Sequence, residues 1–125
     1  MQIKNIRVLF ILLVSILMVQ DALGQSQSTI NWYFGNSGNA IRFIRPDYTP
    51  TGVTIPNNLG QGMSAVATDP VSGEVLFYTD GVTVYDATDA IMPNGTGLSG
   101  SSAINQTVAV THNPGTPDEY FIFTN

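Results

Sequence analysis

The chain has 125 residues, of which only 10% are charged, and its formal net charge is −5 at neutral pH. It contains no cysteine, so disulfide bonds cannot contribute to its stability. It has no lysine after Lys4 and no cluster of basic residues, which excludes the electrostatic footprint of a nucleic-acid-binding protein.

Residues 1–24 have the pattern of a secretory signal peptide. Lys4 and Arg7 precede an uncharged apolar run over 8–19, and a small-x-small motif ends at Gly24. The run is shorter than the roughly 20 apolar residues that a membrane-spanning helix needs. We therefore predict a helical signal peptide that is cleaved after Gly24 and leaves no membrane span in the exported chain.

The next segments predict two strands and a long connection. The aromatic residues of 31–34 and the alternating apolar residues of 40–44 favour strands, and Pro46 closes the second one because it cannot donate a ladder hydrogen bond. The interval 47–62 is rich in Pro, Gly, Asn and Thr. We expect it to be an extended connection with at most a short strand at 53–55.

The aromatic run Trp32-Tyr33-Phe34 admits two interpretations. It could form a stacking platform for sugars, as in carbohydrate-binding modules. Consecutive strand residues point to opposite faces, however, so only Trp32 and Phe34 share one. We therefore expect these two side chains to pack against a neighbouring sheet.

Residues 64–85 predict a three-stranded antiparallel meander. Asp69-Pro70-Val71-Ser72-Gly73 is a turn sequence, and Asp80-Gly81 predicts a two-residue type I′ hairpin turn, in which both central residues need a positive φ. The three strands are expected at 64–68, 74–79 and 82–85.

The remainder predicts a short outer strand at 90–92, a flexible loop at 93–97, and two further strands at 107–111 and 119–124. Beyond Gln25, the sequence lacks a sustained apolar period of 3.6, so we expect essentially no helix there.

An internal repeat organises the chain. Ala65-Val66-Ala67-Thr68-Asp69-Pro70 aligns with Ala109-Val110-Thr111-His112-Asn113-Pro114, and Phe77-Tyr78-Thr79-Asp80 aligns with Ile122-Phe123-Thr124-Asn125, at offsets of 44 and 45. Repeats of about 40–45 residues are typical of β-propellers, in which each period supplies one four-stranded blade. We predict an all-β fold of antiparallel meanders that resemble incomplete β-propeller blades. Residues 25–125 would form about two blades, truncated within the second, with further copies following in the natural gene.

Three carboxylates around one predicted hairpin are candidates for binding calcium: Asp80, Asp86 and Asp89. Oxygen ligands suit Ca²⁺, but the spacing matches no EF-hand loop. The alternative is that Asp80 forms a turn and that the other two carboxylates end strands.

The residues for catalysis are sparse. His112 is the only histidine, and no serine lies in a Gly-x-Ser-x-Gly context. A protein zinc site is disfavoured by one histidine and no cysteine. We expect no enzymatic activity and no cofactor.

Three segments carry a family resemblance: Asn31-Trp32-Tyr33-Phe34-Gly35-Asn36, Phe77-Tyr78-Thr79-Asp80-Gly81 with Val84-Tyr85-Asp86, and Ile91-Met92-Pro93-Asn94-Gly95-Thr96-Gly97-Leu98. Together they resemble the N-terminal, propeller-like region of large bacterial surface proteins that are exported by the type IX secretion system and carry a gliding-motility-associated C-terminal sorting domain. The resemblance covers most of 31–125. It implies a secreted scaffold and no catalytic residues.

The sequence therefore predicts a non-catalytic scaffold or interaction module, the N-terminal part of a larger protein that is secreted or held at the cell surface after export through the Sec pathway. The expected partners are surface polysaccharide or other surface proteins, and not nucleic acid. Two alternatives remain: part of a carbohydrate-active propeller enzyme whose acidic residues come partly from other blades, or a small β-sandwich that binds carbohydrate.

Overall fold

The computed structural model describes residues 26–35, 38–62, 64–101, 108–116 and 118–125, and over these ranges the chain is all-β. The expectation of antiparallel sheets without helix is confirmed there. The predicted helical signal peptide lies outside the described residues. The strands are β1 Asn31–Tyr33, β2 Asn39–Ile44, β3 Thr49–Thr54, β4 Ala65–Thr68, β5 Val75–Thr79, β6 Thr83–Asp86, β7 Ile91–Thr96, β8 Val108–His112 and β9 Tyr120–Thr124.

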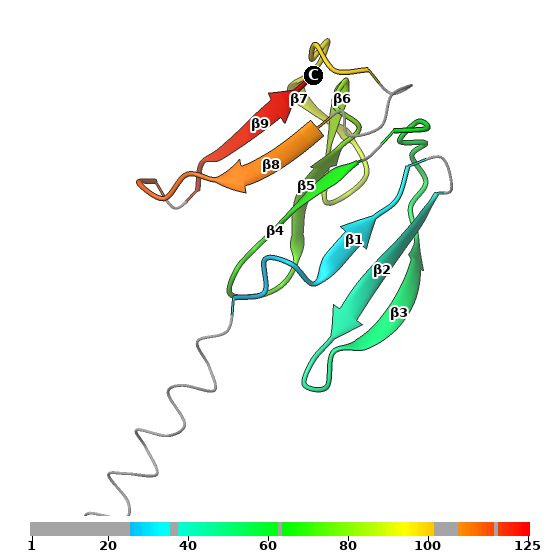
Figure 1. Cartoon of the computed structure of the whole chain (residues 1–125), viewed down its shortest axis with the longest axis vertical. Helices are drawn as coiled ribbons and strands as arrows, with labels where there is room; N and C mark the ends of the chain where they lie inside the picture. Colours follow the sequence, from blue (N-terminus) through cyan, green and yellow to red (C-terminus); the bar gives the residue numbers. More distant parts are fainter. Residues whose placement is uncertain (1–25, 36–37, 63, 102–107, 117) are drawn as a thin grey trace, which may run out of the picture.

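The strands form three antiparallel sheets that follow one another along the chain (Figure 1). Sheet A has the order β1-β2-β3, sheet B has the order β4-β5-β6-β7, and sheet C pairs β8 with β9. The first strand of each sheet lies next to the first strand of its neighbour, because β4 contacts both β1 and β8. Sheet B is therefore placed between sheets A and C.

Sheet A contains a strand, β3, that the sequence did not predict at this length. The interval 47–62 was predicted to be a connection with at most three strand residues, but β3 pairs with the whole of β2, from Asn39 opposite Thr54 to Ile44 opposite Thr49. Every residue of β3 is exposed, so no buried apolar face marks it in the sequence. Its position at the sheet edge explains why Pro50 is tolerated, since an edge strand needs hydrogen bonds on one side only.

Sheet B contains the predicted meander, and its first three strands are confirmed. The type I′ prediction for Asp80-Gly81 is wrong. Gly81 has φ 88°, but Asp80 is not among the residues of positive φ, and Thr79 pairs with Val84, so the loop is longer than two residues. The Oδ1 of Asp80 accepts hydrogen bonds from the backbone N–H groups of Val82 and Thr83, at 2.8 and 2.7 Å. These bonds hold the chain in the wider loop.

Strand β7 corrects a second prediction, since it spans the whole of 91–96, where a three-residue strand followed by a loop was expected. It is the outer strand of sheet B, and Thr83 and Tyr85 of β6 pair with Thr96 and Ile91 across an irregular register. The edge position accommodates Pro93, and the residue after it, Asn94, has a positive φ. Proline and glycine, read as loop formers, here mark an irregular edge strand.

Sheet C repeats the first two strands of sheet B. The paired residues Ala65↔Thr79 and Val66↔Tyr78 correspond to Ala109↔Phe123 and Val110↔Ile122, each 44 positions later. In space Phe77 therefore corresponds to Phe121, and not to Ile122 as the sequence alignment predicted. A β-bulge in sheet B and a longer turn in sheet C offset each other and hide this register in the sequence.

Two apolar clusters lie on the two faces of sheet B. Ala40, Ile55 and Leu59 pack on Tyr78 at the interface with sheet A. At the interface with sheet C, Phe77 and Val84 form a cluster with Ala67, against which Val110, Tyr120 and Ile122 pack. Adjacent residues of β5 thus serve opposite interfaces, as the two-residue period of a strand requires. Each fully buried aromatic or aliphatic side chain contributes about 1.5–3 kcal/mol.

Polar contacts fix sheet A against sheet B. The buried Nδ2 of Asn31 donates to Thr68 Oγ1 at 3.2 Å and to the carbonyl oxygen of Gly73 at 3.1 Å. Arg42 donates to the same carbonyl and forms an ion pair with Glu74 at 3.0 Å. These contacts set the position of β1 beside β4, because each one needs a defined geometry.

Candidate functional site

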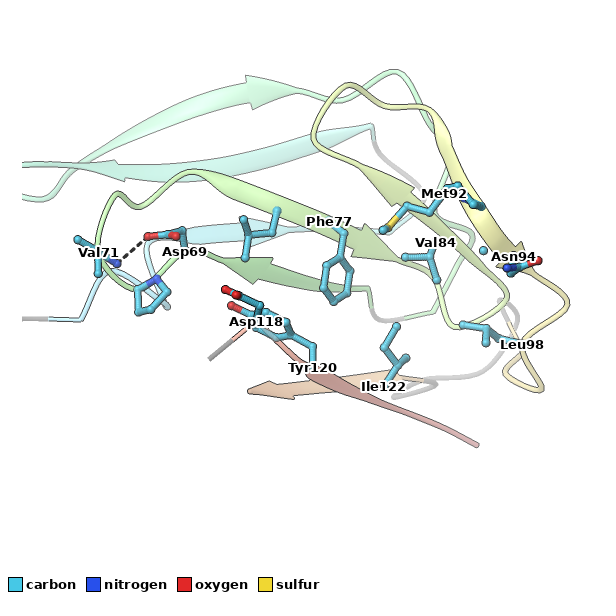
Figure 2. Close-up of a pocket in the computed structure, with 14 residues that line it drawn as sticks. Asp69, Val71, Phe77, Val84, Met92, Asn94, Leu98, Asp118, Tyr120 and Ile122 are labelled. Atoms are coloured by element: carbon cyan, nitrogen blue, oxygen red, sulfur yellow. Dashed lines mark hydrogen bonds between the residues drawn. The ribbon is translucent and has the colours of Figure 1, made fainter. Parts of the chain in front are cut away.

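An apolar groove of about 720 Å³ lies between sheets B and C. Figure 2 shows Phe77 and Val84 of sheet B pointing toward Tyr120 and Ile122 of β9, with Met92 and Leu98 at one end. The rings of Phe77 and Tyr120 meet edge to face, with 5.5 Å between centroids. The volume of the groove lies within the range of small-molecule sites, which are mostly apolar with a few polar groups.

The strands place these side chains by their alternation. Phe77 pairs with Asp86, and the buried Val84 lies two residues before Asp86 on the same face of β6. On β9, Tyr120 and Ile122 alternate with the exposed Phe121 and so face sheet B. The groove is therefore the incompletely filled part of the interface between the two sheets.

Two carboxylates lie at one end of the groove: Asp69 in the turn between β4 and β5, and Asp118 in the turn between β8 and β9 (Figure 2). Asp69 Oδ1 accepts hydrogen bonds from the backbone N–H groups of Ser72 and Val71, at 2.6 and 2.8 Å, and these bonds lower the pKa of Asp69. Burial, followed by the charges of Asp69 and Asp118, raises the pKa of Tyr120. The Tyr120 hydroxyl therefore stays neutral, and this end of the groove would favour a cation over an anion.

The three calcium candidates each make hydrogen bonds within their own part of the sheet. Asp80 holds its loop as described above. Asp86 Oδ1 accepts hydrogen bonds from Thr88 Oγ1 at 2.6 Å and Thr88 N at 2.8 Å, which lower its pKa. Asp89 Oδ1 accepts a hydrogen bond from the hydroxyl of Tyr78 at 2.6 Å. No group of three or more acidic, histidine or cysteine side chains placed to hold a metal ion occurs in the part of the chain that the structure describes.

His112 and Ser64, two residue types used in catalysis, make structural contacts here. His112 packs edge to face on Tyr120, with 5.3 Å between ring centroids, and belongs to β8. Ser64 Oγ donates a hydrogen bond to the backbone carbonyl of Tyr33 at 2.7 Å. His112 thus contributes to the packing of β8 on β9, and Ser64 connects the start of sheet B to β1.

Asn57, Tyr78 and Asp89 form a part-buried polar network that the sequence did not predict. The Asn57 Nδ2 donates to Tyr78 OH at 2.7 Å and to the Asp89 carbonyl oxygen at 2.8 Å, while Tyr78 OH donates to Asp89 Oδ1. The Tyr78 ring lies between those of Tyr33 and Tyr85, with centroid separations of 4.9 and 5.3 Å. Burial raises the pKa of Tyr78, and the hydrogen bond to Asp89 raises it further. Nothing in the local sequence marks Asn57, because its partners are 21 and 32 residues away.

The aromatic pair Trp32 and Phe34 corrects an expectation. Both were expected to pack against a neighbouring sheet, but their exposed fractions are 52% and 41%. The residues between and before them, Tyr33 and Asn31, face sheet B, so Trp32 and Phe34 lie on the other side of sheet A. There Trp32 packs on Phe43, edge to face at 5.3 Å, and its Nε1 donates a hydrogen bond to the carbonyl oxygen of Thr29 at 2.9 Å.

No family model, no curated protein and no solved structure matches the chain. Within the described ranges, no helix is long and apolar enough to cross a membrane.

Proposed function

We propose that residues 25–125 form a propeller-like, non-catalytic scaffold or interaction module. The observation that carries this proposal is the repeated stacking: three consecutive antiparallel sheets whose first strands, β1, β4 and β8, lie side by side. Propeller blades are antiparallel sheets arranged radially, each packing its faces on the blades before and after it. Sheet B has four strands in the order of the chain, which is the make-up of one blade.

The equal register of sheets B and C gives further support. The turns that join their first two strands also correspond. The Asp69 N–H donates to the Glu74 carbonyl and the Asn113 N–H to the Glu119 carbonyl, both at 2.8 Å. Repeated units that contact only their neighbours present broad outer surfaces, which suits a role in display or binding.

We further propose that this module belongs to a secreted or cell-surface protein, in which its partners are surface polysaccharide or other surface proteins. The support is the signal-peptide pattern of 1–24, the acidic composition of the remainder and the resemblance to surface proteins exported by the type IX system.

Export is tested by producing the full chain with its own N-terminus in a bacterial host and sequencing the N-terminus of the protein recovered outside the cytoplasm. We expect the exported protein to begin at Gln25. A variant with Arg in place of Leu12, in the middle of the apolar run, should stay in the cytoplasm. Recovery of the wild-type chain only in the cytoplasm, starting at Met1, would refute the secretory assignment.

Carbohydrate binding is a second candidate, favoured by the exposure of Trp32 and Phe34 on one face of sheet A. Sugars stack on exposed aromatic rings, and Trp offers the largest one. Affinity electrophoresis in gels that contain a soluble polysaccharide tests this function. Retardation that is lost in Trp32→Thr and kept in Val71→Thr, a change at an exposed turn residue, would establish it, and unchanged mobility on every polysaccharide would exclude it.

A further inference from the structure

The groove between sheets B and C leaves apolar surface open to solvent. Leu76 and Val71 line it, yet their exposed fractions are 37% and 85%. Phe77 and Val84, which are buried, line it further along. A hollow of about 720 Å³ with this lining is large enough for a small organic molecule, and covering its apolar side chains would be favourable.

The two ends of the groove differ in charge. Figure 2 shows Asp69 and Asp118 at one end and Met92 and Leu98 at the opposite end. The charges of both aspartates act on the hydroxyl of Tyr120, which lies at the same end. A molecule with one charged end and an apolar body would therefore match the groove in a single orientation.

The positive side chains of the described residues do not neutralise the carboxylate end. Arg42 forms its ion pair with Glu74 at the interface of sheets A and B, and Arg45 follows β2 in sheet A, so neither lines the groove. Asp69 is held by backbone N–H groups, which favour its charged form without a counterion. A cation is the charge that this end would attract.

The ring of Tyr120 also favours an organic cation. It lines the groove beside the carboxylates, as do Pro70 and Val71. Aromatic rings attract ammonium groups, and the carbon atoms of an alkylammonium group gain from contact with apolar side chains. A metal ion would gain nothing from these three residues.

We propose that the groove between sheets B and C binds a small amphipathic cation, with its ammonium group at Asp69 and Asp118 and its apolar chain extending along Phe77 toward Met92. The occupant is a single soluble molecule of the alkylammonium class. This site goes beyond the proposed scaffold role and does not depend on it, because the groove is formed by sheets B and C alone.

The test uses the full chain and three probes with the same octyl chain: octyltrimethylammonium, octanol and octyl sulfate, each below the concentration at which it forms micelles. Titration calorimetry measures the affinities. We expect the neutral alcohol to bind about fivefold more weakly than the cation, and the anion more weakly still. With hexyl and decyl chains, the affinity of the cation should change about two- to fourfold per methylene group. Equal affinities for octanol and octyltrimethylammonium would overturn the proposal.

The methyl signal of Met92 in a carbon–proton NMR spectrum locates the bound probe. Met92 lines the apolar end of the groove, and the variant Met92→Leu identifies its signal. We expect this signal to shift during the titration with the dissociation constant that calorimetry gives. A probe held elsewhere, for example by the apolar run of 8–19, would leave the Met92 signal unchanged, and that result would overturn the proposal.

The variants Asp69→Asn and Asp118→Asn each remove one charge from the groove. Asn113 accepts a hydrogen bond in the corresponding turn of sheet C, so an amide should keep the turn at residue 69. The control is Asp47→Asn, which removes a charge from the turn between β2 and β3, where Thr49 donates to it. We expect the affinity for octyltrimethylammonium to fall about threefold in each groove variant, about tenfold in the double variant, and not in the control. Equal losses in all single variants would contradict the site, because net charge alone would explain them.

Two further measurements keep this test decisive. Circular dichroism verifies that each variant folds, and if Asp69→Asn does not, Asp118→Asn decides, because Asp118 is exposed. Higher ionic strength should weaken the binding of the cation and leave that of octanol unchanged, since salt screens exposed charges. An affinity for the cation that does not depend on salt would contradict its contact with the carboxylates.

Discussion

Asn113 takes, in the turn of sheet C, the place that Asp69 takes in sheet B. Gly115 N–H donates to Asn113 Oδ1 at 3.0 Å, as Val71 N–H donates to Asp69 Oδ1 at 2.8 Å. The turn therefore needs a side-chain oxygen two residues before the donor, and not a negative charge. An amide and a carboxylate fill that role equally, but only the carboxylate makes the turn sensitive to pH.

The first expectation concerns acid. Backbone hydrogen bonds from Ser72 and Val71 hold the pKa of Asp69 below its usual value, and hydrogen bonds from Thr88 do the same for Asp86. At pH values near the ordinary pKa of an aspartate, the unfolded chain therefore binds more protons than the folded chain. Stability should be lost as pH falls through the pKa values of the folded protein. We expect the urea midpoint to fall between about pH 5 and about pH 3. In Asp69→Asn the fall should be smaller, and an equal fall in both proteins would contradict the assignment.

A second expectation concerns the part-buried network of Asn57, Tyr78 and Asp89. Tyr78→Phe removes the hydroxyl that donates to Asp89 and accepts from Asn57, so we expect a loss of about 1–3 kcal/mol in the free energy of unfolding. Tyr85→Phe is the matched control, because its ring stacks on Tyr78 and its hydroxyl makes no hydrogen bond to another described residue. Equal losses in the two variants, measured by urea denaturation, would show that the network contributes nothing specific.

At the scale of elements, the loop between β5 and β6 depends on one backbone angle. Gly81 has φ 88°, a conformation that a β-branched residue resists, so Gly81→Val should cost about 1 kcal/mol or more. Gly52→Val is the control: β3 is extended there, and an added side chain would meet open space. Valine favours strands, so we expect Gly52→Val to leave the melting temperature unchanged or to raise it slightly. A Gly81→Val protein as stable as the wild type would contradict the loop geometry.

The sequence predicted strands well where they have a buried face and poorly where a strand has no buried residue or contains proline and glycine. The strand at 40–44 could be identified because one of its faces packs on sheet B, and the strand at 75–79 because both of its faces are covered by neighbouring sheets. Strand β3 has no buried residue, and β7 includes Pro93 and Gly95, so neither has the pattern that identifies a strand. The sequence alignment also matched Ile122 with Phe77, whereas the strand register makes Phe121 the counterpart of Phe77. The bulge in sheet B and the longer turn in sheet C offset each other, so the sequence does not show this register.

The candidate site was less predictable than the strands. The groove between sheets B and C joins residues from four strands, and Asn57 finds its partners in two other segments, so both depend on how the sheets stack. The aromatic pair Trp32 and Phe34 was assigned to a core because strand alternation gives which residues share a face, but not which face is covered. Trp32 is exposed because sheet A packs on sheet B with its other face, which carries Asn31 and Tyr33.

At the scale of the whole molecule, the stack leaves its middle sheet covered on both sides and its end sheets covered on one. Apolar faces that remain open promote association. The propeller-like arrangement proposed above follows from this fixed sense of stacking between neighbouring sheets.

The most direct test of this account is whether sheet B lies between sheets A and C in solution. Nuclear Overhauser contacts between aromatic rings measure this, in protein dilute enough to be monomeric by sedimentation, so that the contacts arise within one molecule. The account requires contacts of Tyr78 with Tyr33 and of Phe77 with Tyr120, whose ring centroids are 4.9 and 5.5 Å apart. A two-layer sandwich would leave one face of sheet B in solvent. Contacts on both faces would therefore support the propeller-like stack, and a folded protein in which Phe77 shows no contact with Tyr120 would contradict it.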